Sequence, residues 1–342
     1  MSTVLSPGAA PSVMRTPRRR VLGRPIPAEG EHGLFTQSWF PLCLASEVPP
    51  GKILGVDFLD GRVIVFRGTG GKAQALSAYC PHLGADLSVG DVQGDTVRCA
   101  FHHWRYNQEG ECVKTGIGDP PPPGACLFRF PTAEKHGLIW AFNGEEPLFD
   151  LPEFPYPDEE LVRKVEAFDK LLPVDPWVIC CNTPDLQHIK VLHHVTFEQE
   201  DPDEEIEWTS HSMLYDFKGK HVNGEPIAYR VGIYGTTIFY QSSIFNGRWF
   251  GFIAPFGLPR PGQCKTYMVI VARKAEGSDA ANEAFLNFAM DLEKKVVSED
   301  APILRTIHFK PGVLTKSDKA LARFLQYLRN YPRAHPSREF IS

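Results

Sequence analysis

The sequence predicts an α+β protein with an all-β N-terminal domain and a larger C-terminal domain, in which helices pack against one antiparallel sheet. Short strand-like runs separated by turn residues fill residues 35–147. Longer runs rich in β-branched and aromatic residues follow, and then two amphipathic helical stretches. A chain of 342 residues of which 43% are apolar has enough length and apolar surface for two such cores.

Three segments of different composition divide the chain. Residues 1–33 are rich in Pro, Gly, Ser and Arg and show little periodicity, which predicts a flexible N-terminal tail. The alternative for this tail is an arm that contacts a partner or a neighbouring subunit. Its arginine triplet at 18–20 is not followed by an apolar stretch, so we do not expect an export signal. Residues 34–150 form the predicted all-β domain and residues 151–342 the predicted second domain.

Composition argues against several functional classes. The formal net charge of −5 gives no sign of a general nucleic-acid-binding protein. No run of about 18 apolar residues occurs, so we expect no membrane span. The eight cysteines are scattered rather than packed as in a small disulfide scaffold. With no recognisable signal peptide, reduced thiols and a cytoplasmic location are expected.

Turn residues mark the strands of the first domain. Strand-like residues 52–59 and 62–67 flank Asp60-Gly61, which is a two-residue hairpin signal. Residues 136–142 form another short apolar strand. The first domain is therefore expected to consist of short antiparallel strands.

The second domain begins with a helical segment near residues 183–194, for which Thr183 is the expected N-cap and Pro184 suits the first turn. Five longer strands follow, at residues 212–219, 228–235, 236–244, 248–255 and 265–274. Their Val, Ile, Tyr and Phe content is typical of an antiparallel sheet. One curved sheet with helices on it is therefore expected.

Two helices end the second domain. The first is expected near residues 281–300, with a buried face formed by Phe285, Phe288, Leu292 and Val296. The second is expected to begin after Ser317 as the N-cap. Its packed residues recur at helical spacing and are Leu321, Phe324, Leu325 and Leu328.

Four residues of metal-ligand type stand in two short loops. Cys80 and His82 are followed, after sixteen intervening residues, by Cys99 and His102. Zinc would take all four ligands in one tetrahedron, but zinc fingers commonly pair Cys with Cys and His with His. Here each loop offers one cysteine and one histidine, an order that suits a two-iron cluster in which one iron takes both cysteines and the other both histidines.

A second group of such residues lies in the predicted helix near 183–194. Asp185 and His188 share one helix face, and His193 lies five residues after His188. On a regular helix His188 and His193 would point about 140° apart, so both reach one metal only if the helix bends, bulges or ends between them. His194 is the rival of His193. Two histidines and one carboxylate form the facial triad of non-heme Fe(II) oxygenases, which leaves positions open on the metal.

The third ligand must come from elsewhere in the chain. The carboxylates of the predicted helix near 281–300 supply the candidates, which are Asp291, Glu299 and Asp300. Asp291 is expected on a charged outer face of the helix, together with Glu293, Lys294 and Lys295. These residues alone leave the choice between Glu299 and Asp300 open.

The first constellation, including Pro81 and Trp104, resembles the motif of the Rieske [2Fe–2S] domain. The run FHHWRYNQEGEC at residues 101–112 is similar to that of the Rieske non-heme iron oxygenase alpha subunits, and among these to the aminopyrrolnitrin oxygenases. The resemblance covers nearly all of residues 35–335. It implies a three-sheet Rieske domain that binds the [2Fe–2S] cluster through the two cysteines and two histidines, followed by a catalytic domain of helix-grip architecture.

The same resemblance assigns the remaining site residues. The family spacing favours His193 over His194 as the second iron ligand. The run SEDAPILRTI at residues 298–307 resembles the segment that carries the third ligand, which implies Asp300, with Glu299 as the chief alternative. Asp185 would bridge His188 to His102 of a neighbouring chain. The resemblance therefore also implies a homotrimer, with electron transfer between subunits.

The function implied is that of the terminal oxygenase of a multicomponent system, which activates O2 at a mononuclear Fe(II). No G-x-G-x-x-G turn of a nicotinamide or flavin domain is found, so electrons from NAD(P)H are expected through a separate reductase, with or without a ferredoxin. The strand region from 239 to 252 is rich in aromatic residues, which favours an aromatic or polycyclic substrate. An electron-transfer or ligand-binding Rieske protein without oxygenase activity is the alternative.

Overall fold

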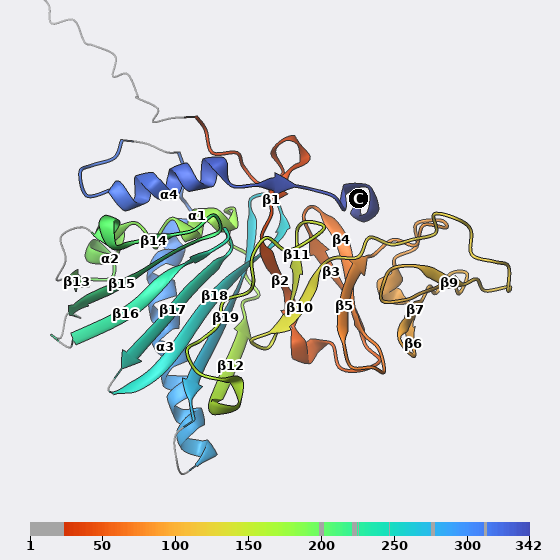
Figure 1. Ribbon diagram of the computed structural model, residues 1–342, viewed down its shortest axis with the longest axis horizontal. Helices are drawn as coiled ribbons and strands as arrows, with labels where there is room; N and C mark the ends of the chain where they lie inside the picture. The colour runs from red at the N-terminus through yellow and green to blue at the C-terminus, as the bar shows by residue number, and fades with distance from the viewer. Residues whose placement is uncertain are drawn as a thin grey trace, which may run out of the picture.

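The computed structural model describes residues 24–197, 202–220, 224, 226–245, 247–274, 278–310 and 313–342. Within them the predicted α+β architecture is confirmed. Three small antiparallel sheets form the first part of the chain, and one large antiparallel sheet with helices on it forms the second. Figure 1 shows the small sheets beside the large one, and the long helix α3 along the opposite face of the large sheet.

The three small sheets use nearly all the strands before residue 150. Their strands are β10 (Thr132–Lys135), β11 (Leu138–Phe142) and β2 (Trp39–Leu44); β3 (Ile53–Phe58), β4 (Gly61–Arg67) and β5 (Ala73–Ser77); and β6 (Asp91–Gln93), β7 (Thr96–Arg98), β8 (Arg105–Tyr106) and β9 (Cys112–Lys114). All of these pairs are antiparallel. The expected hairpin around residue 60 and the strand near 136–142 are both present.

The hairpin turn lies one residue earlier than predicted. Phe58 pairs with Gly61, so the two loop residues are Leu59 and Asp60, with φ angles of 52° and 64°. Both loop N–H groups donate to backbone carbonyls of the large sheet, which holds this left-handed backbone in place. Gly61 is needed for a different reason, because a Cβ there would lie 2.4 Å from the carbonyl oxygen of Ile341.

The large sheet has the strand order β12-β19-β18-β17-β16-β15-β13, with β14 paired to β15. Its strands are β12 (Leu161–Ala167), β13 (Thr196–Phe197), β14 (Glu207–Trp208), β15 (Ser212–Lys220), β16 (Pro226–Tyr234), β17 (Ile238–Phe245), β18 (Arg248–Arg260) and β19 (Gln263–Arg273). The five predicted strands correspond to β15 to β19. The sequence did not indicate β12, which pairs with β19 along its whole length.

The two faces of the large sheet pack against different partners because side chains alternate along each strand. On one face, Tyr240 and Ile253 join a core with Trp140 and Phe142 of β11. On the other, Phe252 and its neighbours on β17 and β18 join a core with the helices. The N-terminal domain therefore covers one face of the sheet, and the helical face remains available for a site.

The helices are α1 (Pro176–Cys180), α2 (Leu186–Val191), α3 (Asp279–Leu304), α4 (Lys319–Asn330) and α5 (Arg338–Ile341). The predicted N-cap Thr183 is wrong. Asp185 is the cap, because its backbone is non-helical and its carboxylate accepts the N–H of His188 at 3.0 Å. The last long helix likewise begins one residue later than expected, with Asp318 in place of Ser317 as the cap.

The buried side of α3 is rotated from the predicted one. Leu286, Ala289, Met290 and Glu293 are buried, whereas Phe288 is 46% exposed. The prediction counted only large apolar residues and treated Glu293 as part of a charged surface. Leu286 and Met290, together with Ala289 and the buried acid Glu293, form the packed stripe instead, and its apolar members pack into the core between the helices and the sheet.

Both ends of the described chain contact the junction between the two parts. The prediction of a tail at 1–33 falls partly on residues 1–23, which lie outside the described residues. Within residues 24–33, Ile26 and Glu29 are buried. At the other end, β20 (Arg333–Ala334) pairs with β1 (Phe35–Thr36), and Ile341 packs into the core of the small sheets. The division near residue 150 remains a prediction, and the C-terminal segment crosses it.

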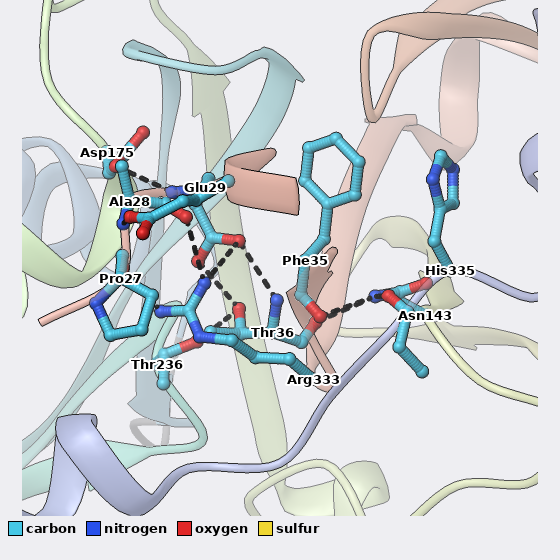
Figure 2. Close-up of polar contacts among 12 residues, drawn as sticks. Pro27, Ala28, Glu29, Phe35, Thr36, Asn143, Asp175, Thr236, Arg333 and His335 are labelled. Carbon is cyan, nitrogen blue, oxygen red and sulfur yellow. Dashed lines mark hydrogen bonds and ion pairs between the residues drawn. The ribbon is translucent and has the colours of Figure 1, made fainter. Parts of the chain in front are cut away.

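A buried polar cluster centred on Glu29 holds these segments together (Figure 2). The Glu29 carboxylate accepts hydrogen bonds from the N–H and the hydroxyl of Thr36, both at 2.9 Å, and lies 3.6 Å from the guanidinium of Arg333. The backbone N–H of Glu29 donates to Asp175 at 3.0 Å. Burial raises the pKa of Glu29 to about 7, against the lowering effect of Arg333 and Thr36.

We expect Glu29→Ala to destabilise the junction by about 3–5 kcal/mol, because it leaves the Arg333 guanidinium buried without its carboxylate. Denaturant unfolding should show the loss, and limited proteolysis should show earlier cleavage between residues 24 and 36. Glu31→Ala, at an exposed position two residues away, is the matched control and should change stability by less than about 1 kcal/mol. Equal effects of the two substitutions would contradict the role of the cluster.

Candidate functional site

The four residues of the first constellation lie in two facing loops of the small sheets. Cys80 follows β5, and Cys99 follows β7 directly. Each loop closes in a tight turn: the N–H of Gly84 donates to the carbonyl of Cys80 at 2.8 Å, and that of His103 to the carbonyl of Cys99 at 3.1 Å. The turns bring both cysteines to the inner side of the loops, where both are buried.

The two histidines lie on the outer side. The rings of His82 and His102 are exposed, with their centroids 4.5 Å apart in an edge-on arrangement. Trp104 stacks on His82 at 4.4 Å between ring centroids. His103, outside the C-x2-H spacing, is exposed with a φ of 58° and belongs to the turn.

This donor set fits a [2Fe–2S] cluster with one iron held by buried thiolates and the other by exposed imidazoles. The hydroxyl of Tyr106 lies 3.0 Å from Cys80 Sγ. Burial raises the pKa of the Cys80 thiol, and the hydrogen bond from Tyr106 works in the opposite direction. A hydroxyl that donates to a ligating sulfur removes charge from it, which favours the reduced form of a cluster.

The second constellation converges on one carboxylate oxygen. His188 Nε2 lies 2.8 Å from Asp300 Oδ1, and His193 Nε2 lies 3.4 Å from the same atom. One ligand atom from each of the three residues lies within 4.8 Å of the other two. Two imidazoles and one carboxylate in this arrangement fit a mononuclear Fe(II) with open coordination positions.

The local backbone explains why His188 and His193 meet. The helix α2 ends at Val191, so the 140° separation of a regular helix does not apply to His193. His194 follows with a φ of 55° and is exposed. A left-handed residue just beyond a helix reverses the chain, which turns His194 outward and leaves His193 inside.

Glu299 lies on the other side of His193. Its carboxylate is 2.8 Å from His193 Nδ1, whereas Asp300 contacts the Nε2 atoms of both histidines. Glu299 therefore orients the imidazole, and Asp300 is the carboxylate placed to share a metal with it. The predicted preference for Asp300 over Glu299 agrees with this geometry. Asp291 is exposed on the outside of α3.

Electrostatics keep the carboxylate ionised. Burial raises the pKa of Asp300, but the hydrogen bonds and charges of His188 and His193 outweigh it and hold the pKa at about 2. Burial lowers the pKa of His193, but Asp300 and Glu299 outweigh it and the net shift is upward. An ionised carboxylate is the form that binds a metal, whereas a proton on His193 competes with the metal.

Asp185 caps α2 through the backbone N–H of His188. The ring Nδ1 of His188 lies 3.3 Å from the carbonyl oxygen of Asn182 instead. Among the described residues, no hydrogen bond joins the Asp185 carboxylate to the His188 ring. The bridge from Asp185 to a neighbouring His102 therefore stays a prediction.

An apolar cavity opens beside the three converging residues, between the helical face of the sheet and α3. Of the aromatic residues predicted near the pocket, Phe239 and Phe252 line it, while Tyr240 and Trp249 pack on the opposite face of the sheet. Gln241 and Glu293 are among the polar lining residues that sequence reasoning missed. Glu293 stands seven residues before Asp300, which is two helical turns, so the helical period could have placed it on the same face.

We expect Glu299→Gln to weaken iron binding at this site by about 10–100-fold, because it removes the charge that orients His193. Chelator competition followed by iron analysis would measure the change. Asp291→Asn, an exposed position on the same helix, serves as the matched control and should leave iron affinity unchanged. Unaltered affinity in Glu299→Gln would show that the contact does not orient the ligand.

A family model described as Rieske [2Fe-2S] domain matches residues 38–123, which include all four residues of the first constellation. Similar curated proteins include a cholesterol 7-desaturase from Bombyx mori, 31% identical over 53% of this chain and 39% of the relative. The oxygenase component of a 3-ketosteroid-9-alpha-monooxygenase from Rhodococcus rhodochrous is 34% identical over 37% of this chain and 33% of the relative. These alignments span less than two fifths of the relatives' own length.

Solved structures share this fold over most of the chain. Dicamba monooxygenase bound to dicamba superposes with a TM-score of 0.66 at 17% identity, covering 86% of this chain and 97% of that chain. NdmA from Pseudomonas putida CBB5 with caffeine gives a TM-score of 0.64 at 19% identity, over 86% and 90% of the two chains. Residues 38–123 are therefore a Rieske [2Fe-2S] domain, and the chain as a whole shares the fold of these solved structures.

Proposed function

We propose that the protein is the terminal oxygenase component of a multicomponent Rieske oxygenase. The convergence of His188, His193 and Asp300 at an apolar cavity is the observation that carries the proposal. A mononuclear Fe(II) held there would supply O2 activation, and a [2Fe–2S] cluster would supply electrons one at a time. The chain's own residues hold these groups, exclude water from the cavity with apolar walls and fix the substrate beside the open metal positions.

An aromatic or steroid-like small molecule is the proposed substrate. The cavity walls are mainly apolar, with aromatic side chains contributed by β17 and β18. Two of the relatives are named for cholesterol and for 3-ketosteroids, and two of the solved structures for dicamba and caffeine. The reactions to test are hydroxylation, demethylation and desaturation, together with the N-oxygenation suggested by the resemblance to aminopyrrolnitrin oxygenase. Both monooxygenation and dioxygenation are to be considered.

We propose a reductase, with or without a ferredoxin, as the electron donor, and a homotrimer as the working assembly. Figure 1 shows the strands β6 to β9, which border the cluster loops, at one end of the molecule, far from α2 at the other. Exposed apolar side chains surround the exposed His82 and His102, among them Leu83 and Phe101 at 67% and 61% exposure. A neighbouring chain that covers this surface would bring its mononuclear site to the cluster. No helix of the described residues is long and apolar enough to cross a membrane.

The activity is tested by turnover under labelled O2. The full chain with its cluster, a surrogate reductase and NADH is incubated with cholesterol, a 3-ketosteroid, caffeine and dicamba in separate reactions. Label in a product, with substrate-dependent NADH consumption, is the expected result; a desaturated product without label would also support the proposal. If the cluster is reduced and reoxidised but none of the four compounds is changed, the result would favour the alternative, an electron-transfer or ligand-binding protein.

A further inference from the structure

We propose that Glu293 and Gln241 form a polar subsite that binds a hydroxyl group of an otherwise apolar ring-shaped substrate. This inference rests on the proposed function, which it deepens by naming a substrate class. The Glu293 side chain is buried and its carboxyl oxygen Oε1 accepts a hydrogen bond from Gln241 Nε2 at 2.8 Å. The same Nε2 donates to the hydroxyl of Ser243 at 3.0 Å. Both Glu293 and Gln241 line the cavity beside the iron site.

The subsite lies at a defined place relative to that site. Glu293 and Asp300 occupy the same face of α3, two turns apart, which is about 10 Å along the helix axis. Val296 and Val297 line the wall between them, and Phe239 and Phe252 line the wall across from it. A molecule with one polar end and an apolar ring body therefore matches the distribution of polar and apolar groups in the cavity.

The hydrogen-bonding atoms that Gln241 and Glu293 leave available determine which polar group of a ligand can bind. The amide nitrogen of Gln241 has both of its hydrogens directed to partners, Glu293 and Ser243. Among the described residues, Gln241 Oε1 and Glu293 Oε2 have no hydrogen bond, and neither atom is fully enclosed. Tyr215 and Tyr229 also bring hydroxyls to this wall, and that of Tyr215 donates to the carbonyl of Thr183 at 2.8 Å. The two available oxygens of Gln241 and Glu293 are therefore acceptors that a ligand hydroxyl can reach.

Burial of Glu293 decides between ligand classes. Burial raises the pKa of Glu293 to about 7, so its neutral and ionised forms coexist near neutral pH. A ligand hydroxyl suits both forms, since it donates to the carboxylate or to Gln241 Oε1 and accepts from the neutral acid. A carbonyl or ether oxygen is bound only by the neutral acid. An ammonium group would have to be desolvated beside apolar walls, with Glu293 as its charged partner at this end of the cavity.

The test measures binding and needs no turnover. Equilibrium dialysis of the full, cluster-loaded chain compares 2-naphthol with 2-methoxynaphthalene and naphthalene, and 5α-androstan-3β-ol with 5α-androstane. In the first set, the hydroxyl of 2-naphthol can donate and accept a hydrogen bond, and the methoxy oxygen of 2-methoxynaphthalene can only accept one. Naphthalene has no hydrogen-bonding group. The second set extends the comparison to a steroid-sized ring system. We expect each alcohol to bind about tenfold or more tightly than its matched non-alcohols, as one net hydrogen bond in a buried site provides.

Variants locate the effect. In Glu293→Leu and Gln241→Leu the preference for the alcohol should fall below about twofold, while naphthalene affinity changes little. Glu293→Gln, which keeps hydrogen-bonding atoms at the position, should retain part of the preference. Asp291→Asn, on the exposed side of the same helix, should retain all of it. Cluster absorbance and iron content show whether each variant is folded.

The wild-type comparison decides the proposal even if the variants do not fold. Equal affinities within a set, tightest binding of the hydrocarbon, or no binding of any probe would overturn it. A preference for the alcohol that survives both leucine substitutions would also overturn it. Failure of the oxygenase assay with an intact alcohol preference would instead reject the proposed function and leave the subsite standing, because the two measurements are independent.

Discussion

Asp300→Ala is expected to remove the mononuclear iron and leave the [2Fe–2S] cluster in place. Asp300 Oδ1 is the atom on which both His188 and His193 converge, so its loss leaves two imidazoles without the carboxylate of the triad. The cluster residues lie in other elements, in loops after β5 and β7. Iron should fall from about three to about two per chain, with acid-labile sulfide unchanged at about two. Substrate oxidation should fall by a factor of about 1000 or more.

Two further variants make this result specific. Glu299→Ala should weaken iron binding without abolishing it, because Glu299 contacts the far nitrogen of His193. Asp291→Ala should change neither iron content nor turnover. Full retention of the third iron in Asp300→Ala would contradict the ligand assignment. Loss of the third iron in Glu299→Ala but not in Asp300→Ala would transfer the assignment to Glu299.

Asp185→Asn is expected to leave three irons and a reducible cluster in each chain but to lower turnover by about 100-fold or more. Asparagine caps a helix as well as aspartate does, so the contact to the His188 N–H is preserved. A bridge between two imidazole N–H groups, in contrast, needs the acceptor capacity of a carboxylate. The substitution therefore separates the capping role, which the structure shows, from the proposed electron-transfer role.

Rapid-mixing spectroscopy would locate the defect. In Asp185→Asn the reduced cluster should persist when substrate and O2 are added, while in the wild type it should be oxidised within one turnover. Asp185→Ala should add a loss of about 1 kcal/mol in stability, because the cap of α2 is removed. Turnover by Asp185→Asn at the wild-type rate would reject the bridge and leave Asp185 with its capping role alone.

How far each part of the site was predictable depends on sequence distance. Cys80, His82, Cys99 and His102 stand within 23 consecutive residues, so their order along the chain already favoured a cluster over a zinc site. His188 and His193 share one segment, and only the end of α2 had to be anticipated. Asp300 is 112 residues from His188, and no local pattern links them. Its assignment came from resemblance, and the geometry agrees with it.

The sequence failed where tertiary packing overrides local preference. Glu293 reads as one of a run of surface charges, yet it is buried against Gln241 in the cavity. Gly61 is predicted to be the second residue of a turn, yet its missing side chain makes room for Ile341, the penultimate residue of the chain. Residues 24–33 read as part of a flexible tail, yet a buried Glu29 ties them to Arg333. In each case the deciding partner lies more than 50 residues away in the chain.

The content of iron and acid-labile sulfide in the purified full chain counts both proposed metal sites in one measurement. We expect about three irons and two sulfides per chain, with one cluster on Cys80, His82, Cys99 and His102 and one iron on His188, His193 and Asp300. Two irons and two sulfides, unchanged after reconstitution with Fe(II), would contradict the oxygenase. Zinc without sulfide would contradict the Rieske cluster itself.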